Sequence, residues 1–314
     1  MKKFISIVNP CYNEEANVEN LYKQIKSVIA ECGDYEYEHI FIDNNSSDNT
    51  VKIIKDIAKV DKNVKLIVNS RNFGQVRSPF YGLLQASGEA VIIMASDLQD
   101  PPWMIKDLLV KWEQGYKVVK AVKTHSKESA GMFFVRKAFY TIIKKLSDVE
   151  LTKHFDGTGL YDKEVIKILR NVNDPYPFLR GLVAEIGFEQ AIVEYTQRFR
   201  KEGKSKHNFY SLFDMAILGI VSCSKIPLRF ASILGFLLSG ISLFLAVLYF
   251  VLKLIFWRSF PIGSAPMIIA IFFFSSVQLF FIGVLGEYIS ILYTKVQNRP
   301  LVIEKERVNF DNKS

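Results

Sequence analysis

Short apolar runs alternate with stretches of helical apolar spacing in the amino-terminal part of the chain. The apolar runs predict buried strands at residues 4–8, 39–42 and 64–69, and in the run that begins at Val91. The amphipathic stretches predict helices over residues 18–29, 51–57 and 80–86. Strands that alternate with helices predict an α/β fold with a parallel sheet and right-handed crossovers.

The pattern is less regular after Trp103. It predicts helices over residues 105–112, 132–146 and 163–170, and strands over residues 117–122 and 192–195. Gly157 and Gly159 interrupt the stretch 155–162, to which we assign no helix or strand. The α/β domain is therefore expected to occupy residues 1–206.

Two long apolar stretches follow this domain. Residues 230–252 contain no charged side chain over 23 positions, and residues 267–286 contain none over 20. Each stretch is long enough to cross a hydrocarbon core of about 30 Å as a helix. Helices of this length buried in a soluble core would be unusual. We therefore predict two transmembrane helices, 230–252 and 267–290, within residues 229–293.

The charges around these stretches predict their orientation. Residues 198–229 and 295–307 are rich in Lys and Arg, whereas only Lys253 and Arg258 lie between the apolar stretches. By the positive-inside rule, the α/β domain and both termini are cytoplasmic, and the chain is a multi-pass protein of the cytoplasmic (inner) membrane. Residues 207–228 are expected to form an interfacial amphipathic segment, and residues 294–314 a cytoplasmic tail.

The composition agrees with a membrane protein, because 49% of the 314 residues are hydrophobic. The formal net charge is +8, but there is no nucleic-acid-binding motif, so we expect no nucleic acid partner. The positive charge suits an anionic membrane surface or anionic substrates. Cys11, Cys32 and Cys223 have neither pairing nor metal-binding spacing, which indicates a reducing compartment.

Acidic side chains follow the fourth predicted strand. Asp97, Gln99 and Asp100 precede two prolines, which cannot continue a β-ladder. Carboxylate and amide oxygens at the carboxyl end of a strand suit Mg²⁺ or Mn²⁺, although a solvated acidic turn is the simpler alternative. Asp43 and the loop 10–14 follow two other predicted strands, so we expect them at the same sheet edge.

A basic segment follows the last predicted strand and reads Arg198-Phe199-Arg200-Lys201-Glu202-Gly203-Lys204-Ser205-Lys206. One interpretation is a cluster of charges beside the membrane surface. The other is a segment that folds over the phosphates of a ligand. The sequence alone leaves both interpretations open.

Four motifs occur in the order and spacing of family 2 glycosyltransferases. They are Pro10-Cys11-Tyr12-Asn13-Glu14-Glu15, Asp43-Asn44-Asn45-Ser46-Ser47-Asp48-Asn49-Thr50, Arg71-Asn72-Phe73-Gly74 and Ser96-Asp97-Leu98-Gln99-Asp100-Pro101-Pro102. Together with the two apolar stretches, they make nearly the whole chain resemble the polyprenyl-phosphate glycosyltransferases. That group includes dolichyl-phosphate mannose synthase and the bacterial bactoprenyl glucosyl and N-acetylglucosaminyl transferases.

This resemblance implies a Rossmann-like GT-A catalytic domain with a carboxyl-terminal transmembrane hairpin. It also implies a nucleotide-sugar donor, a divalent metal and a lipid-phosphate acceptor. By position, the donor would be bound by Pro10, Tyr12, Asn13, Glu14, Asp43, Ser96, Asp97 and Gln99. Asp97 and Gln99 would hold the metal, and Asp97 and Asp156 would be catalytic. Diphosphate or acceptor phosphate would meet Arg136, Arg198, Arg200, Lys204 and Ser205.

The sequence departs from the family pattern at three places. Ala95 stands where the first Asp of the Asp-x-Asp motif is expected, and Asn44 stands for the second Asp of the Asp-Asp-Gly-Ser run. Asp156 lies one position away from a base proposed in some family members, so it either assists the acceptor or caps a loop. Asn13 and Glu14 have an alternative role as caps of the first helix.

These expectations combine into one reaction: a single sugar moves from a UDP-sugar to undecaprenyl phosphate, with inversion at the anomeric carbon. A phosphate acceptor is already anionic near neutral pH, so it needs no strong general base. The reaction does need cations that neutralise the leaving diphosphate. UDP is preferred over GDP by resemblance to the bacterial enzymes, and the sugar itself is not encoded in the motifs.

Two other functions remain open. A glycan-elongating transferase is less favoured, because the sequence has no Gln-x-x-Arg-Trp motif and only two spans. A weakly active nucleotide-sugar-binding scaffold for a lipid-sugar flippase agrees with Ala95 and Asn44. The related enzymes also suggest a homo-oligomer.

Overall fold

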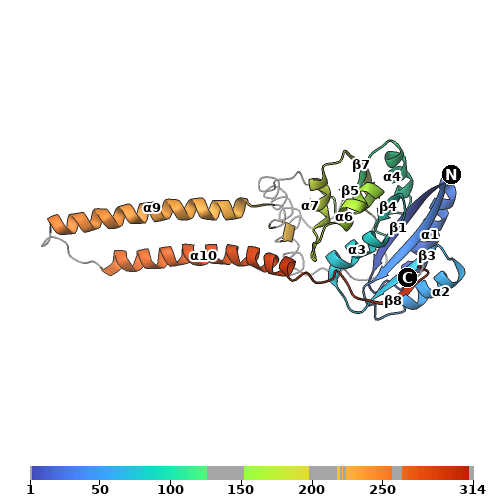
Figure 1. Cartoon of the computed structure of the whole chain (residues 1–314), viewed down its shortest axis with the longest axis horizontal. Helices are drawn as coiled ribbons and strands as arrows, with labels where there is room; N and C mark the ends of the chain where they lie inside the picture. Colours follow the sequence, from blue (N-terminus) through green and yellow to red (C-terminus); the bar gives the residue numbers. More distant parts are fainter. Residues whose placement is uncertain are drawn as a thin grey trace.

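The computed structural model describes residues 2–125, 152–197, 218–219, 221, 224–256 and 264–310. The described residues form a mixed sheet of eight strands in the order β7-β5-β6-β4-β1-β2-β3-β8. Helices cover both faces of this sheet, and two long helices extend away from it side by side (Figure 1). The α/β class predicted from the sequence is confirmed.

The amino-terminal half is a run of strand–helix units. Its elements are β1 (Lys3–Cys11), α1 (Val18–Cys32), β2 (Tyr35–Asp43), α2 (Thr50–Val60), β3 (Val64–Asn69), α3 (Gly74–Gln85) and β4 (Ala90–Ile93). β1 pairs in parallel with β2 and β4, and β2 pairs in parallel with β3. Every strand and helix predicted here from apolar spacing is present.

The second half departs from a wholly parallel sheet. Its elements are α4 (Met104–Glu113), β5 (Val118–His125), β6 (Gly159–Asp162), α6 (Lys163–Arg170), α7 (Leu179–Ile186) and β7 (Gln190–Thr196). β6 runs antiparallel to both β4 and β5. The prediction of a parallel sheet is therefore wrong at this position. The predicted helix 132–146 lies outside the described residues.

β6 was not predicted because its glycine was interpreted as a loop signal. A Cβ atom at Gly159 would lie 2.3 Å from the carbonyl oxygen of Val119 on the neighbouring strand. The glycine is needed because β5 approaches the backbone closely. All four residues of β6 are buried, so the strand shows no polar–apolar alternation either.

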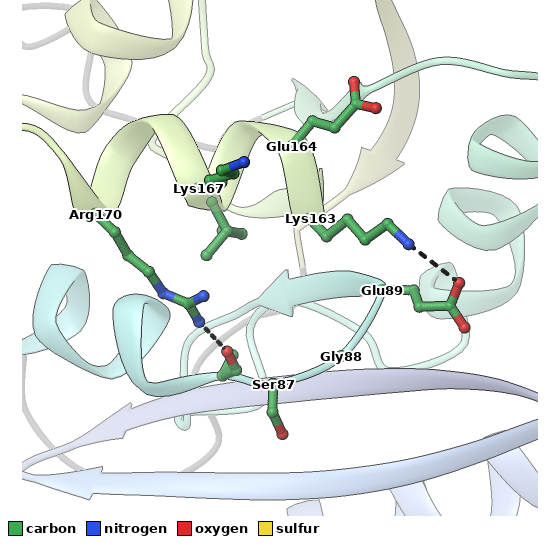
Figure 2. A pocket seen from close by; sticks show the side chains of 9 residues that line it. Ser87, Gly88, Glu89, Lys163, Glu164, Lys167 and Arg170 are labelled. Atoms are coloured by element: carbon green, nitrogen blue, oxygen red, sulfur yellow. Dashed lines mark hydrogen bonds and ion pairs between the residues drawn. The ribbon is translucent and has the colours of Figure 1, made fainter.

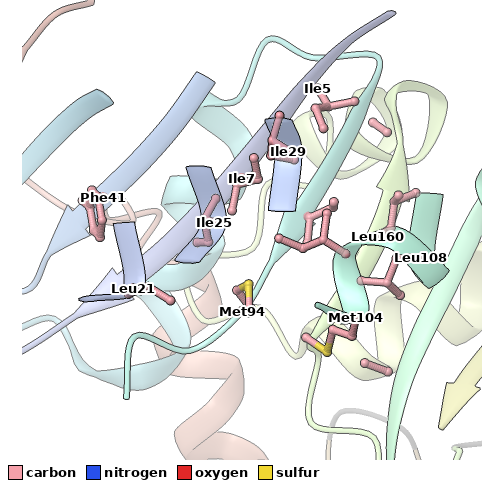
Figure 3. Close-up of a cluster of buried hydrophobic side chains, with 14 of the residues drawn as sticks. Ile5, Ile7, Leu21, Ile25, Ile29, Phe41, Met94, Met104, Leu108 and Leu160 are labelled. Atoms are coloured by element: carbon pink, nitrogen blue, oxygen red, sulfur yellow. The ribbon is translucent and has the colours of Figure 1, made fainter. Parts of the chain in front are cut away.

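The sheet has an apolar layer on each face. Figure 3 shows the layer in which Ile5 and Ile7 of β1 meet Leu21 and Ile25 of α1. Val8, the next residue of β1, belongs to the layer on the opposite face. Because side chains alternate along a strand, a strand with apolar residues at every position is buried on both faces. This accounts for the continuous apolar runs in the sequence.

The two long helices are α9 (Ile226–Ile255) and α10 (Ser264–Val296). The predicted spans 230–252 and 267–290 lie within them, and both helices are long and apolar enough to cross a membrane. Their apolar side chains are largely exposed. The hydroxyl of Tyr288 in α10 donates a 2.8 Å hydrogen bond to the carbonyl of Ser224, just before α9. This contact joins the two helices next to the α/β domain.

The tail after α10 returns to the sheet, which the sequence analysis did not foresee. Residues Glu304–Val308 form β8, antiparallel to β3 at the outer edge. Arg77 of α3 donates hydrogen bonds of 2.6 and 2.8 Å to the carbonyls of Pro300 and Leu301. The mostly charged sequence of β8 suits an edge strand, because charged side chains discourage pairing with another sheet.

Arg77→Gln should loosen this tail, because a shorter side chain cannot reach both carbonyls. Hydrogen bonds from a charged donor contribute about 1.5–3 kcal/mol when buried, so for this half-buried group we expect a loss of about 1–2 kcal/mol. Thermal unfolding of the full chain in detergent would show this as a lower Tm. Arg71→Gln is the matched control, since Arg71 is exposed, lies over the Phe73 ring as Arg77 does, and donates one longer hydrogen bond, 3.3 Å to the Asn72 carbonyl. Equal Tm values for the two variants would contradict the assignment.

A buried polar relay crosses three strands beneath the carboxyl ends of the sheet. The Nε2 atom of His39 lies 2.7 Å from Oδ1 of Asn9, whose Nδ2 donates to the Met94 carbonyl at 2.9 Å. Since Oδ1 only accepts, Nε2 of His39 carries the proton. Nδ1 is buried with no partner among the described residues. Burial therefore lowers the pKa of His39 from 6.5 to about 3.

This shift predicts a loss of stability on acidification. The unfolded chain binds a proton at His39 below pH 6.5, whereas the folded chain stays neutral down to about pH 3. Between about pH 7.5 and about pH 5, His39 should lower the free energy of unfolding by about 2 kcal/mol. His39→Gln keeps a donor but does not titrate, so its unfolding free energy should change less over the same interval. Parallel pH profiles from urea denaturation of the two proteins would refute this.

Candidate functional site

The polar motifs meet at one edge of the sheet. β1, β2, β3, β4, β5 and β7 all point the same way, so their carboxyl ends lie together, and antiparallel β6 begins there. We call this the carboxyl edge. The loops that follow β1, β2 and β4 contain Tyr12, Asn44 and Asp97, and the loop before β6 contains Asp156. The prediction that the acidic motifs share one edge is confirmed.

The acidic turn, residues 94–100, follows β4 and is fixed at its beginning. Asn9 binds the carbonyl of Met94, and the Ser96 hydroxyl donates a 2.8 Å hydrogen bond to the Pro10 carbonyl. Further on, the Gln99 backbone N–H donates to Oδ1 of Asp97 at 3.2 Å. Asp97 and Gln99 are both half-buried, so their side chains reach solvent at the carboxyl edge.

Asp100 closes the acidic turn as a buried anchor. Its side chain accepts a 2.5 Å hydrogen bond from the hydroxyl of Tyr195 at the end of β7 and a 3.2 Å hydrogen bond from Thr158. Asp100 is only 2% exposed. Burial, together with the negative charge of Asp156, raises the pKa of this carboxyl to about 6. Asp100 therefore holds the turn against β7 and the loop before β6.

Lys123 brings a positive charge to the same cluster. Its ammonium group lies 2.6 Å from a carboxylate oxygen of Asp156 and 4.0 Å from Asp100. Burial disfavours the charged form of Lys123, but Asp156 and Asp100 outweigh it and raise the pKa of the ammonium group. Burial likewise opposes the charge of Asp156, and Lys123 outweighs it and lowers the pKa of that carboxyl. The Asp156 side chain remains 44% exposed.

The sequence analysis missed Lys123 and Tyr195 as site residues. Lys123 follows the predicted strand 117–122 by one residue, and Tyr195 is the last residue of the predicted strand 192–195. Both strands end at the carboxyl edge, as β5 and β7 show. Their positions at the carboxyl ends of predicted strands could have marked them as site residues, because ligands bind at that edge of such sheets.

The loops after β1 and β2 are joined by hydrogen bonds. The backbone N–H of Asn13 donates to the Ser46 hydroxyl, and the Ser47 N–H donates to Oδ1 of Asn13, both at 2.8 Å. The backbone N–H of Glu14 donates to the Thr50 hydroxyl at 2.8 Å. Asn13 thus bridges two loops, while the residue at the N-cap of α1 is Asn17. The side chain of Glu14 accepts a 2.7 Å hydrogen bond from Asn17.

Asp43 lies below these loops and is fully buried. Its carboxylate accepts hydrogen bonds from the backbone N–H of Ser46, at 2.8 Å, and from the Ser46 hydroxyl. Burial raises the pKa of Asp43 although both hydrogen bonds favour its charged form. In this structure Asp43 shapes the loop after β2. It pairs with Cys11, the last residue of β1, and Pro10 and Tyr12 flank Cys11 in the chain.

Asn44 explains one departure from the family pattern. Its amide oxygen accepts hydrogen bonds from the backbone N–H of Phe73 at 2.8 Å and from Asn69 at 3.2 Å. Its amide nitrogen donates to Asn72 at 2.9 Å and to the Gly74 carbonyl at 3.2 Å. An aspartate could not make the last two contacts, because a carboxylate only accepts. Asn44 therefore joins the loops after β2 and β3.

The predicted phosphate contacts lie outside the described residues. These are Arg136, Arg198, Arg200, Lys204 and Ser205. Their predicted roles remain predictions. In the part of the chain that the structure describes, Lys123 places a positive charge beside the acidic turn.

A surface groove of about 540 Å³ lies at the opposite edge of the sheet (Figure 2). It is lined by Ser87 and Glu89 before β4 and by Lys163, Lys167 and Arg170 of α6. Lys163 lies 3.7 Å from Glu89, and Arg170 donates to backbone carbonyls before β4. The groove lies before β4, whereas the acidic turn follows β4, so the two are separate.

The acidic turn fits a divalent metal that also binds substrate. Among the residues that the structure describes, no three His, Cys, Asp or Glu side chains gather as a metal cluster. Mg²⁺ typically binds one or two carboxylates and completes its sphere with water and substrate phosphates. Asp97, which is half-buried and has one carboxylate oxygen outside the turn's hydrogen bonds, meets this requirement, with the Gln99 amide beside it.

Comparisons with known proteins agree with this geometry. The family model "Glycosyl transferase family 2" matches residues 6–168, about half of the chain. The bactoprenol glucosyl transferase of Shigella phage SfII is 34% identical over 96% of this chain and 97% of its own length. The putative glycosyltransferase CsbB of Bacillus subtilis is 35% identical over 98% and 93%.

Among solved structures, glucosyl-3-phosphoglycerate synthase of Mycobacterium tuberculosis with UDP is 18% identical, with a TM-score of 0.47 over 70% of this chain and 78% of its own. The family match and the near full-length relatives establish what the motifs suggested. The chain is a glycosyltransferase and belongs to glycosyl transferase family 2.

Proposed function

We propose that the protein transfers one sugar from a UDP-sugar to undecaprenyl phosphate at the cytoplasmic face of the membrane, with inversion at the anomeric carbon. The observation that carries this proposal is the position of the acidic turn on a domain joined to two apolar helices. Relatives named bactoprenol glucosyl transferase support a polyprenyl phosphate acceptor. A hexose or N-acetylhexosamine is the expected sugar.

The charges at the carboxyl edge suit a reaction between two anions. With Mg²⁺ or Mn²⁺ bound at Asp97 and Gln99, the metal would neutralise the donor diphosphate. Lys123 supplies a further fixed positive charge within the same cluster. Asp156 holds that ammonium group in place, and its exposed carboxylate is the nearest candidate to assist the acceptor. Fixed charges of this kind stabilise the transition state without reorganising during the reaction.

The described tail supports the proposed topology. β8 comes after α10, yet it pairs with β3 of the amino-terminal domain. Two helices that each cross a bilayer return the chain to the side on which it started. The α/β domain and β8 would then share one side, as their pairing requires. The positive-inside rule favours the cytoplasm for that side.

The scaffold alternative rests on Ala95 and Asn44, and Ala95 leaves Asp97 as the one carboxylate of the Asp-x-Asp position. A scaffold would bind a nucleotide sugar without turning it over. A direct transfer assay separates the two functions. Membranes that contain the protein are given undecaprenyl phosphate, Mg²⁺ or Mn²⁺ and labelled UDP- or GDP-sugars, and the lipid phase is extracted.

Label should enter the lipid with one UDP-sugar, and a chelator should abolish it. Asp97→Asn should lower kcat/KM by about 100-fold or more, because it removes the charge that holds the metal. Asp156→Asn frees Lys123 but leaves the metal ligands intact, so its loss should be smaller, about tenfold. UDP-sugar binding without transfer in the unmodified protein would favour the scaffold.

Tyr195→Phe tests whether the Asp100 anchor positions the metal ligands. Loss of a group that orients metal ligands typically lowers metal affinity about 10- to 100-fold. We expect about a tenfold weaker binding of Mn²⁺ in the presence of UDP, measured by electron paramagnetic resonance of free Mn²⁺. Tyr81→Phe is the control, because it removes a tyrosine–carboxylate hydrogen bond to Glu304, away from the acidic turn. Unchanged Mn²⁺ affinity in Tyr195→Phe would limit Asp100 to a structural role.

A further inference from the structure

The motif Arg71-Asn72-Phe73-Gly74 occupies the connection between β3 and α3. None of the donor, metal or phosphate contacts implied by the family resemblance lies in this motif. Residues 70–73, called the β3–α3 loop below, follow the carboxyl end of β3, so they lie at the carboxyl edge. The contacts of the loop indicate what it does there.

On one side, the β3–α3 loop is bonded to the loop after β2. The backbone N–H of Phe73 donates to Oδ1 of Asn44 at 2.8 Å, and Nδ2 of Asn44 donates to Asn72 at 2.9 Å. Asn44 and Phe73 are both buried. Asn44 directly follows Asp43, and the loop after β2 also bonds to Asn13. The β3–α3 loop therefore supports residues that are expected to bind the donor.

On the other side, the β3–α3 loop meets the chain that returns from α10. β8 is antiparallel to β3, and its first residue, Glu304, pairs with Asn69, the last residue of β3. Residues 299–303, called the tail segment, must therefore lie at the carboxyl edge. The backbone N–H of Ser70 donates to the carbonyl of Ile303 at 2.9 Å. Figure 1 shows this part of the chain running from α10 past α3 to β8.

Arg77, in the first turns of α3, joins the tail segment to the β3–α3 loop. Its guanidinium group donates to the carbonyls of Pro300 and Leu301, at 2.6 and 2.8 Å. The same group lies over the ring of Phe73, with 5.1 Å between Cζ and the ring centroid. A guanidinium over an aromatic ring is attracted by the negative face of the ring. The contacts thus run without a break from the tail segment through Arg77 and Phe73 to Asn44.

We propose that the tail segment is a positioning element of the donor site. Through Arg77 and Phe73 it holds the loop after β2 in the arrangement that binds the nucleoside of the UDP-sugar. A loop that is already ordered binds a ligand more tightly, because no ordering cost is charged against the affinity. Donor affinity therefore depends on residues that follow both long helices. This inference rests on the proposed function, because the donor contacts of that loop are themselves proposed.

The alternative role of the tail is to cover the outer edge of β3. β8 does this, and it has anchors of its own. The hydroxyl of Tyr81 in α3 donates to Glu304 at 2.8 Å, and Lys55 of α2 lies 2.5 Å from Glu306. Neither contact involves the β3–α3 loop. Tyr81→Phe therefore loosens the same tail from the same helix without touching the connection to Asn44, which makes it the matched control.

The unmodified chain is tested first. It should bind UDP in the presence of Mn²⁺, measured by isothermal titration calorimetry of the full chain in detergent, and it should be active in the transfer assay. Absence of UDP binding would overturn the proposed function and this inference together. Binding without transfer would overturn the proposed transfer alone, and the affinities of the variants would still decide the inference.

Arg77→Gln should raise the Kd for UDP about fivefold, because changes along such chains of contacts typically alter binding by about twofold to thirtyfold. The KM for the UDP-sugar should rise by a similar factor, whereas kcat at saturating donor should change less than about twofold, since the acidic turn is untouched. Arg77→Lys keeps the charge and should lose less affinity. Tyr81→Phe should bind UDP like the unmodified chain. All measurements are made well below the Tm of the least stable variant.

Hydrogen exchange of the full chain gives an independent measurement. In Arg77→Gln, the Phe73 amide N–H that is bonded to Asn44 should exchange faster, and so should the amides of residues 43–50. In Tyr81→Phe, neither should change. Unchanged UDP affinity in Arg77→Gln, an equal loss of affinity in Tyr81→Phe, or a lower kcat at an unchanged KM would overturn the proposal. So would unchanged exchange at Phe73 in Arg77→Gln.

Discussion

The hydrogen bonds that fix the acidic turn are the interactions on which the carboxyl edge depends. The turn is held at its beginning by Asn9 and Ser96 and at its end by Tyr195. These contacts reach β1 on one side and β7 on the other, although β7 is far from β1 in the sheet order. Asp97 lies between fixed points, so its position is set by the sheet and not by the turn alone. Such support is what separates a binding turn from a solvated one.

The second constraint is the return of the tail to the sheet. β8 occupies the outer edge of β3, and Arg77 fixes the chain between α10 and β8. Lys295 near the end of α10 also lies 2.9 Å from Asp174, in the turn between α6 and α7. The α/β domain is thus attached to the helix pair at several points. On the proposed function the acceptor is anchored in lipid, so the carboxyl edge would have to lie at a fixed height above the membrane, and these contacts would restrict that height.

The sequence predicted most of the first half of the fold, because strands buried on both faces appear as continuous apolar runs. The prediction of strands failed where one sequence feature is compatible with two structures. Gly159 suggested a loop, but the residue is required by the close approach of Val119 within the sheet. Residues 294–314 were expected to be a cytoplasmic tail with no strand, but they contain the mostly charged strand β8, because edge strands tolerate charge. For the site, motif spacing located Asp43, Asp97 and the β1 loop at one edge, but pairing partners such as Lys123 with Asp156 depend on long-range packing that spacing does not encode.

The departure at Ala95 is compatible with the charges around it. The negative charges of Asp156, Asp100 and Asp97 all raise the pKa of the Lys123 ammonium group. A further carboxylate at position 95 would add negative charge where the proposed donor brings its diphosphate. With one carboxylate in the Asp-x-Asp position, the turn repels that diphosphate less and binds a metal less strongly on its own. On the proposed function, metal and donor would then each strengthen the binding of the other, because the coupling between two ligands at one site is reciprocal. On that proposal, Ala95 would shift the metal's ligands from the protein toward the substrate, which is compatible with catalysis.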